Sequence, residues 1–376
     1  MPPDLQAQSG ERGGRRELAR DLGLALFLDR RLSGTELLNR DEISIITLLL
    51  TYRCPAACDH CVFESSPTNT ATLDPGIAEK LIAAAARQSP PPVLGFSGGE
   101  PFLQLAMMRR LASYAAARGM CSEVVSSSAW AKNGDYARRI LADLKRRGLA
   151  TYCTSVDRFH TPFVAPEKMR TAVLTAREVG LHVILNYQVD PASHAEGEDG
   201  VVRYLGETLD LPEETVRSFQ VNPLVTTPVG RARRNVDGFL YEDKDFREGC
   251  PMVTEVVTLS PFGFLYPCCG MVVGEPPEQA GLFIHDRLED RSVEDIARLL
   301  ETLKRDFFFK LLQYLGPYRI LQELKRRDPT LAIRDHYVGA CDACLELTDN
   351  PRVVEAARDY LAECAARMSG GKSVAA

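Results

Sequence analysis

Three cysteines in one short loop constrain this chain more than any other feature of its sequence. They stand in Cys54-Pro-Ala-Ala-Cys58-Asp-His-Cys61, directly after the apolar run Ile43–Leu50. Thiolates in such a loop can converge on an iron–sulfur cluster or on zinc. A [4Fe–4S] cluster ordinarily takes four protein thiolates, so three would leave one iron open to a small molecule. A zinc site and a disulfide pair are the alternatives at this point.

The composition indicates a protein with a substantial core. The chain has 376 residues, of which 45% are hydrophobic and 26% charged, and its formal net charge is −6. This length predicts two domains, or one large domain with a smaller one. We expect no nucleic-acid partner, because no long basic block stands out, and no membrane partner, because no apolar run is long enough to span one. The start lacks the apolar stretch of a secretion signal, which predicts a cytoplasmic protein.

Apolar runs alternate with segments of helical period from position 43 onward. The runs expected as strands are Ile43–Leu50, Val93–Phe96, Cys121–Ser126, Thr151–Val156, Leu181–Val189 and Val216–Val221. The segments expected as helices cover 75–88, 103–118, 134–147, 166–179 and 198–209. This alternation predicts the α/β class, with a parallel sheet and right-handed crossovers. Six units are too few for a closed eight-stranded barrel, and such folds carry their chemistry at the carboxyl ends of the strands.

A second motif ends the second expected strand. Gly98-Gly99-Glu100-Pro101 alone would indicate only a turn, but it follows the three-cysteine loop at the next strand end. Together the two motifs resemble the radical S-adenosylmethionine (SAM) superfamily. The resemblance implies a partial (β/α)6 TIM-like barrel and a SAM-binding [4Fe–4S] cluster held by Cys54, Cys58 and Cys61. It also implies that a reductant such as flavodoxin or ferredoxin supplies the electron that cleaves SAM to methionine and a 5′-deoxyadenosyl radical.

The resemblance assigns the binding of SAM to residues near the strand ends. The Gly-Gly-Glu-Pro motif would hold the ammonium group, and His60 would stack near the adenine, although metal ligation is its alternative. Ser155 and Asp157 would lie near the ribose or carboxylate, and Asn186 is a further polar candidate at the mouth. The full set of expected cofactor-binding residues is His60, Gly98, Gly99, Glu100, Pro101, Ser126, Ser155, Asp157 and Asn186.

A second group of cysteines follows the sixth expected strand. Cys250 and Cys268 flank two apolar runs separated by Pro261-Phe262-Gly263, which predicts a β-hairpin that brings these cysteines together. Cys341-Asp-Ala-Cys344 is a metal-binding turn, so four thiols are available for a second cluster, with zinc as the alternative. The arrangement resembles the twitch domain, a shortened relative of the SPASM domain. The resemblance implies an auxiliary [4Fe–4S] cluster held by Cys250, Cys268, Cys341 and Cys344.

Two of the remaining cysteines are candidate catalytic thiols. Some radical SAM epimerases return a hydrogen atom to the substrate radical from a cysteine, and such a thiol must lie near the substrate. Cys269 adjoins an expected ligand and is the first candidate, while Cys153 at a strand end is the second. The alternatives for Cys269 are packing beside the cluster and ligation of it.

The expected domain organisation follows these motifs. Residues 1–42 form an N-terminal extension, with a disordered start and a short helix. That extension is shorter than the winged-helix leader-peptide domain of several peptide-modifying relatives. Residues 43–225 form the radical SAM core, 226–349 the twitch/SPASM-like auxiliary cluster domain, and 350–376 a C-terminal helix and tail. A helical stretch over 292–328 lies within the auxiliary domain.

Three functions compete at this level. The first is a radical SAM enzyme that modifies a peptide or an aminosugar-type small molecule by epimerisation, dehydrogenation or cross-linking. The second is a non-catalytic iron–sulfur electron carrier, which has no need of the ammonium site that the Gly-Gly-Glu-Pro motif implies. The third is a zinc-stabilised binding module.

Overall fold

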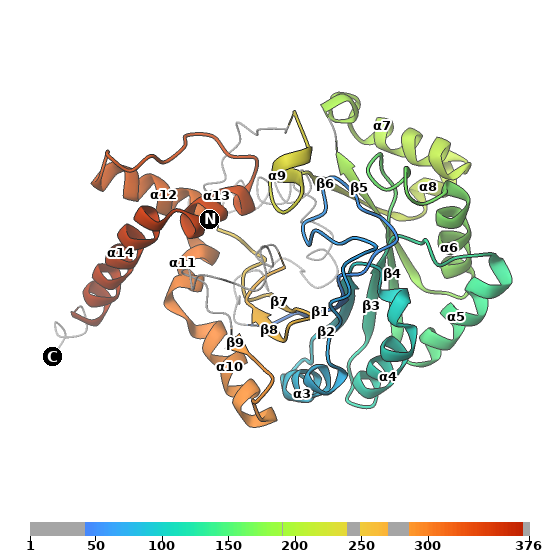
Figure 1. Ribbon diagram of the computed structural model, residues 1–376, viewed down its shortest axis with the longest axis horizontal. Helices are drawn as coiled ribbons and strands as arrows, with labels where there is room; N and C mark the ends of the chain where they lie inside the picture. Colours follow the sequence, from blue (N-terminus) through green and yellow to red (C-terminus); the bar gives the residue numbers. More distant parts are fainter. Residues whose placement is uncertain (1–41, 190, 239–248, 270–285, 371–376) are drawn as a thin grey trace, which may run out of the picture. The chain divides into compact units, whose positions relative to one another are not determined.

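The computed structural model describes residues 42–189, 191–238, 249–269 and 286–370 (Figure 1). The expected N-terminal extension therefore falls almost entirely outside the described residues. The chain forms two compact units. We call Val124–Thr226 the mid-chain unit, and Arg40–Glu123 together with Thr227–Ala376 the cysteine-rich unit.

The sheet of the cysteine-rich unit is built around β1. Its strands are β1 (Ile45–Thr51), β2 (Val93–Gly98), β7 (Val256–Leu259), β8 (Phe264–Tyr266) and β9 (Asp286–Arg287). They follow the order β2-β1-β7-β8-β9, with β1 parallel to both neighbours and β7, β8 and β9 antiparallel in turn. Ile46, Leu48 and Leu50 are fully buried, and so is Leu49 on the opposite face. Burial on both faces explains why β1 reads as one continuous apolar run.

Helices connect the first strands of this unit. They are α3 (Pro75–Ala85), the 3₁₀ helix η2 (Pro101–Gln104) and α4 (Leu105–Ala116). The carboxylate of Asp74 caps α3 by accepting hydrogen bonds from the N–H groups of Gly76 and Ile77, at 2.6 and 3.2 Å. Proline at the first helical position completes this start signal, as the sequence predicted.

The C-terminal part of the same unit is helical. Its helices are α9 (Ala232–Asn235), α10 (Val293–Arg305), α11 (Phe307–Tyr314), α12 (Gly316–Arg327), α13 (Ala340–Asp349) and α14 (Pro351–Gly370). The expected helical stretch over 292–328 is thus three helices. Asp306 breaks it first, because its backbone is extended and its side chain caps α11 through the N–H of Phe309. Gly316, with φ of 77°, stands at the second break.

The mid-chain unit continues the alternation of strands and helices. It contains α5 (Gly134–Arg146), β4 (Leu149–Ser155), α6 (Pro166–Glu178), β5 (His182–Val189), α7 (Pro191–Leu209), α8 (Glu213–Arg217) and β6 (Gln220–Val225). β5 pairs in parallel with β4 and with β6. The sixth strand begins four residues later than predicted, because Pro212 starts α8 and two glutamates occupy its first turn.

The order of elements confirms the predicted fold class. Six strands, each followed by helix, run in sequence as β1 to β6, with β3 (Ser122–Ser126) at the junction of the two units. Neither unit closes its sheet, as in a partial (β/α)6 TIM-like barrel. The predicted hairpin is also present, as the antiparallel pair β7 and β8.

Candidate functional site

The loop of Cys54, Cys58 and Cys61, called here the three-thiol loop, follows the carboxyl end of β1. The N–H of Cys54 donates to the carbonyl of Ser66 at 3.0 Å, and that of Cys61 to the carbonyl of Cys58 at 3.1 Å. Cys54 and Cys58 are buried and Cys61 is half-buried. The pKa of Cys54 is raised to about 12, mainly by burial and in part by the charges of Glu100 and Cys61. The loop therefore presents three thiols within eight residues, and a metal would have to displace their protons to bind.

The Gly-Gly-Glu-Pro turn wraps the end of β1 beside this loop. Gly99 donates its N–H to Thr51 at 2.6 Å, and Glu100 donates its N–H to Arg53 at 2.9 Å. A Cβ on Gly99 would stand 2.2 Å from the carbonyl oxygen of Arg53, so only glycine fits there. Glu100 is 1% exposed, and its carboxylate accepts from the N–H of Phe102 at 3.2 Å. The turn thus brings a buried carboxylate close to the thiol of Cys54, and a buried carboxylate favours a cationic ligand.

Five cysteines gather in the C-terminal part of the cysteine-rich unit. Cys268 and Cys269 follow β8, and α13 supplies Cys341 and Cys344 one helical turn apart. Burial is the main cause that raises the pKa of Cys344, and Cys268, Cys250 and Cys341 add to it. The pKa of Cys269 is likewise raised to about 11, mainly by burial and in part by Cys250. We call these five residues the C-terminal thiol group; the structure brings all four expected auxiliary ligands together with Cys269.

The helix α11 holds the first member of this group in place. The N–H of Cys250 donates to the carbonyl of Leu312 at 2.7 Å. Gln313, 1% exposed, donates through Nε2 to the carbonyl of Val253 at 3.0 Å and to Oγ1 of Thr254 at 2.6 Å. The helical insert before Cys341 therefore supports the thiol group directly. Sequence reasoning missed Gln313, because a single glutamine in a helix carries no motif.

Buried charge fixes the turn that carries Cys341 and Cys344. Asp342 lies between them and is 3% exposed. Its carboxylate accepts from Nη2 of Arg334 at 2.8 Å and from the N–H of Val338 at 3.0 Å. Arg334 also pairs with Glu346 at 2.6 Å. Asp342 and Glu346 therefore attach the start of α13 to the segment that precedes it.

The two thiol sites lie at different levels along β1. β7 starts beside the first residue of β1, and β8 returns with Tyr266 opposite Thr258. Cys268 follows Tyr266 by two residues and so lies near the amino end of β1, whereas the three-thiol loop follows its carboxyl end. At about 3.3 Å per residue, the strand between these levels is about 20 Å long. The cysteines therefore form two sites and not one.

Asp157 and Ser126 organise turns within the mid-chain unit. Asp157 is fully buried, and its Oδ1 accepts from the N–H groups of Phe159 and His160 at 2.9 and 3.1 Å and meets Nδ1 of His160 at 2.8 Å. Ser126 accepts through Oγ from the N–H of Ser128 at 3.0 Å and from Nε1 of Trp130 at 3.1 Å. Both residues shape the ends of their strands, and their contact with SAM stays a prediction.

One face of β4, β5 and β6 carries neutral polar groups. Ser155 pairs in register with Asn186, which in turn pairs with Asn222. Nδ2 of Asn222 donates a hydrogen bond to Oδ1 of Asn186 at 2.9 Å. Oγ1 of Thr226 donates one to Oε1 of Gln188 on β5 at 3.1 Å. Cys153, buried, shares this face because it stands two residues before Ser155. The face offers amide and hydroxyl groups at the carboxyl ends of these strands.

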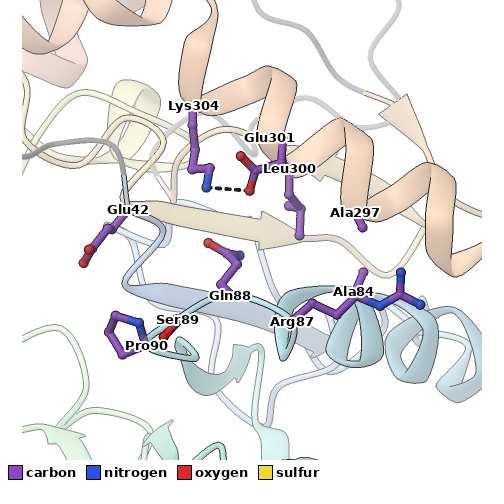
Figure 2. A pocket seen from close by; sticks show the side chains of 10 residues that line it. All are labelled: Glu42, Ala84, Arg87, Gln88, Ser89, Pro90, Ala297, Leu300, Glu301 and Lys304. Atoms are coloured by element: carbon purple, nitrogen blue, oxygen red, sulfur yellow. Dashed lines mark ion pairs between the residues drawn. The ribbon is translucent and has the colours of Figure 1, made fainter.

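A cavity of about 330 Å³ lies at the amino end of β1, between the end of α3 and α10 (Figure 2). Three of its four charged lining residues, Arg87, Glu301 and Lys304, form ion pairs. Lys304 pairs with Glu301 at 2.6 Å, and Arg87 pairs with Glu294 at 2.8 Å. Catalytic sites of parallel α/β folds lie at the carboxyl ends of the strands. The three-thiol loop, and not this cavity, is therefore the candidate site.

Comparison with known proteins gives one relative by sequence. No family model matches the chain. YydG of Bacillus subtilis (strain 168), whose name describes a peptide biosynthesis protein, is 24% identical over 237 residues, which is 61% of this chain and 70% of YydG. Of the described residues, no helix is long and apolar enough to cross a membrane.

Solved structures share the fold. The structure of native anSMEcpe with bound AdoMet and the Kp18Cys peptide matches with a TM-score of 0.52 at 12% identity, over 84% of this chain and 99% of that one. The same protein with AdoMet and the Cp18Cys peptide gives a TM-score of 0.50 at 13% identity over the same shares. The three-thiol loop and the Gly-Gly-Glu-Pro turn occupy consecutive strand ends of this fold. The chain therefore shares the fold of these structures, and it carries at its strand ends the two motifs that resemble the radical SAM superfamily.

Proposed function

We propose that this protein is a radical SAM enzyme that modifies a peptide. The observation that carries the proposal is the three-thiol loop beside the buried carboxylate of Glu100. A [4Fe–4S] cluster fits this loop, because three converging thiols supply soft ligands and leave one iron open. When bound and reduced, the cluster supplies the electron that cleaves SAM to methionine and a 5′-deoxyadenosyl radical.

The chain's own residues bind and orient SAM in this proposal. Glu100 offers a buried negative charge for the ammonium group of SAM, and Gly98 and Gly99 let the turn that carries it pack directly against the backbone after β1. His60 lies in the loop, half-buried, where its ring would stack on the adenine. Ser126, Ser155, Asp157 and Asn186 of the mid-chain unit are the proposed contacts to the ribose and carboxylate.

The C-terminal thiol group would hold an auxiliary [4Fe–4S] cluster. Cys250, Cys268, Cys341 and Cys344 supply four thiols, which is the number that closes a cluster. Their mutual influence on pKa supports one common site. Zinc suits the same ligands, so the metal is part of the proposal.

A peptide is the favoured substrate because of the relatives. The name of YydG describes peptide biosynthesis, and anSMEcpe holds peptides in two of its structures. Amide and hydroxyl groups on β5 and β6 supply neutral hydrogen-bonding partners of the kind that a peptide backbone uses. An aminosugar-type substrate is the second candidate, because its hydroxyls would use the same groups.

The outcome depends on how the substrate radical is quenched. The chemistry that bound SAM would supply is removal of one hydrogen atom from the substrate, with 5′-deoxyadenosine as the by-product. If Cys269 returned a hydrogen atom from its thiol, the product would be the epimer, and one electron from the reductant with one proton from solvent would restore the thiol. Because Cys269 follows Cys268 near the amino end of β1, this role requires a substrate that reaches from the three-thiol loop to the C-terminal thiol group. An auxiliary cluster held by the C-terminal thiol group would instead supply an electron acceptor, and a substrate radical that lost one electron to it and one proton to solvent would give a dehydrogenated or cross-linked product. Cys153 is the second candidate donor, since it lies on the polar face of the mid-chain unit.

Anaerobic reconstitution tests the function. We expect brown protein with roughly eight irons per chain, from about two [4Fe–4S] clusters, and formation of 5′-deoxyadenosine from SAM and dithionite. An electron carrier would bind iron without cleaving SAM, and a zinc-stabilised binding module would be colourless with stoichiometric zinc. Either result would contradict the proposed function. Cys121, which is exposed, provides a control variant, because Cys121→Ala should behave as the wild type.

Mass spectrometry of the product tests the outcome. Run in deuterium oxide with a short peptide encoded beside this gene, an epimerase leaves one deuterium in the product, because the thiol hydrogen exchanges with solvent. A dehydrogenation or cross-link leaves a product that lacks two hydrogens. Cys269→Ala should still form 5′-deoxyadenosine but give no deuterated epimer. Full turnover of that variant would rule out Cys269 as the donor, and the same test on Cys153→Ala decides the second candidate.

A further inference from the structure

The segment after β6 returns to the three-thiol loop. Arg231 donates its backbone N–H to the carbonyl of Cys61 at 3.1 Å. Its guanidinium donates through Nη1 to the carbonyl of Cys58 and through Nη2 to the carbonyl of Ser65, both at 2.7 Å. One side chain thus binds the loop at two points seven residues apart, and its backbone binds a third point between them.

Gly230 allows this close approach. Its φ is 55°, and a Cβ there would stand 2.3 Å from the carbonyl oxygen of Val62 and 2.7 Å from that of Cys61. Those neighbours are backbone atoms, so they cannot move aside without moving the loop. Ala232, two residues after Gly230, is fully buried. The backbone at this point is therefore shaped to lie directly on the loop.

We propose that Arg231 is a positioning residue that holds the three-thiol loop in its cluster-binding conformation and places a positive charge beside it. The rigid fork of a guanidinium can bridge two carbonyl oxygens, which a lysine ammonium cannot do in the same geometry. The positive charge of Arg231 is felt at Cys54, as it is among the groups that act on that thiol. A positive charge next to a cluster favours its reduced form. This inference rests on the proposed function, since it assigns Arg231 to the same loop.

Two substitutions at Arg231 separate geometry from charge. Arg231→Gln removes the charge and the fork, whereas Arg231→Lys keeps the charge alone. Arg234→Gln is the matched control, because it removes the same positive charge from the same segment after β6. Its partner is Glu64 at 2.9 Å, and both side chains are exposed.

The measurements are iron content and the part of the electron paramagnetic resonance signal that changes when SAM is added. We expect Arg231→Gln to fall from roughly eight irons to roughly four, with the C-terminal cluster kept as an internal sign of folding. In the fraction that keeps a SAM-responsive signal, the ratio of reduced to oxidised cluster at a fixed potential should fall about tenfold. Arg231→Lys should lose iron in part but keep the wild-type potential, and Arg234→Gln should match the wild type in both.

The outcomes decide between this inference and its alternatives. If Arg231→Gln holds full iron and shows the wild-type potential, the inference is overturned. If Arg231→Gln fails to fold, Arg231→Lys carries the test: a weakened response to SAM supports the role, and a response equal to the wild type overturns it. A wild-type protein that binds no iron or cleaves no SAM would instead overturn the proposed function itself.

Discussion

The three-thiol loop and the C-terminal thiol group bring their cysteines together in different ways. The loop takes its cysteines from eight consecutive residues after β1, and backbone hydrogen bonds at Cys54 and Cys61 close it. The C-terminal group takes its cysteines from three segments, Cys250, Cys268–Cys269 and α13. A hairpin and a helix must therefore be in place before those thiols meet.

Their supports differ in the same way. The three-thiol loop is held by backbone contact of Gly99 with Arg53, which precedes it, and by hydrogen bonds from Arg231 to its carbonyl oxygens. Buried side chains, Gln313 and Asp342, hold the C-terminal group. A local site is thus built from backbone geometry, while a site assembled from distant segments depends on tertiary packing. We expect the two to fail independently.

The largest effect is expected when the cysteines of one thiol site are replaced at a time. Replacement of Cys54, Cys58 and Cys61 by alanine should abolish formation of 5′-deoxyadenosine and leave roughly four irons per chain. Replacement of Cys341 and Cys344 should also leave roughly four irons but spare SAM cleavage, because the open iron stays. Iron analysis and chromatography of the nucleoside measure both. Loss of SAM cleavage in both variants would show one coupled site instead of two.

Local motifs explain how much the sequence predicted. The order of strands and helices and the hairpin followed from apolar runs and punctuation such as Asp74-Pro75. The loop and the Gly-Gly-Glu-Pro turn were recognisable because each is contiguous. The proximity of the C-terminal cysteines was predictable because a hairpin joins its own ends.

The supporting residues were not predictable, for a physical reason. Gln313 and Asp342 act through contacts that only the tertiary fold creates, and neither stands in a pattern with its partner. The position of β6 was wrong because the charged turn at Glu213 forms a helix where apolar residues suggested a strand. The target of Arg231 is loop backbone, which no sequence pattern reveals.

Substitution of one glycine at each thiol site is expected to have the next largest effect. A Cβ on Gly99 would stand 2.2 Å from a backbone carbonyl at the loop, and one on Gly249 would stand 1.6 Å from the carbonyl oxygen of Gln313. Alanine at either should destabilise the fold by about 3 kcal/mol or more, because backbone must shift. Gly99→Ala should reduce SAM cleavage strongly, and Gly249→Ala should spare it. Chemical denaturation and the nucleoside assay measure the two effects. Gly134→Ala, with open space around the glycine, is the control.

Gln313→Ala tests the side-chain support of the C-terminal group. The variant loses two buried hydrogen bonds, to Val253 and Thr254, and leaves a buried carbonyl without its donor. We expect a loss of about 2 kcal/mol in unfolding free energy and faster release of iron from the C-terminal group under a chelator. SAM cleavage should persist. A variant that releases iron at the wild-type rate would argue against a role for α11 in holding Cys250.

The smallest expected effect is that of Asp342→Asn. The amide keeps an oxygen for the N–H of Val338 but loses the charge that attracts Arg334. Because the side chain of Arg334 is 46% exposed, water replaces much of this attraction, and we expect a loss of about 1 kcal/mol in the free energy of unfolding. A double-mutant cycle with Arg334→Gln measures the interaction energy between Asp342 and Arg334. The negative charge of Asp342 also lies beside Cys341, so its removal should make the C-terminal cluster easier to reduce while the SAM-responsive cluster keeps its potential. A shift of both potentials together would mean that the two sites share one electrostatic environment, against the separation that the strand register indicates.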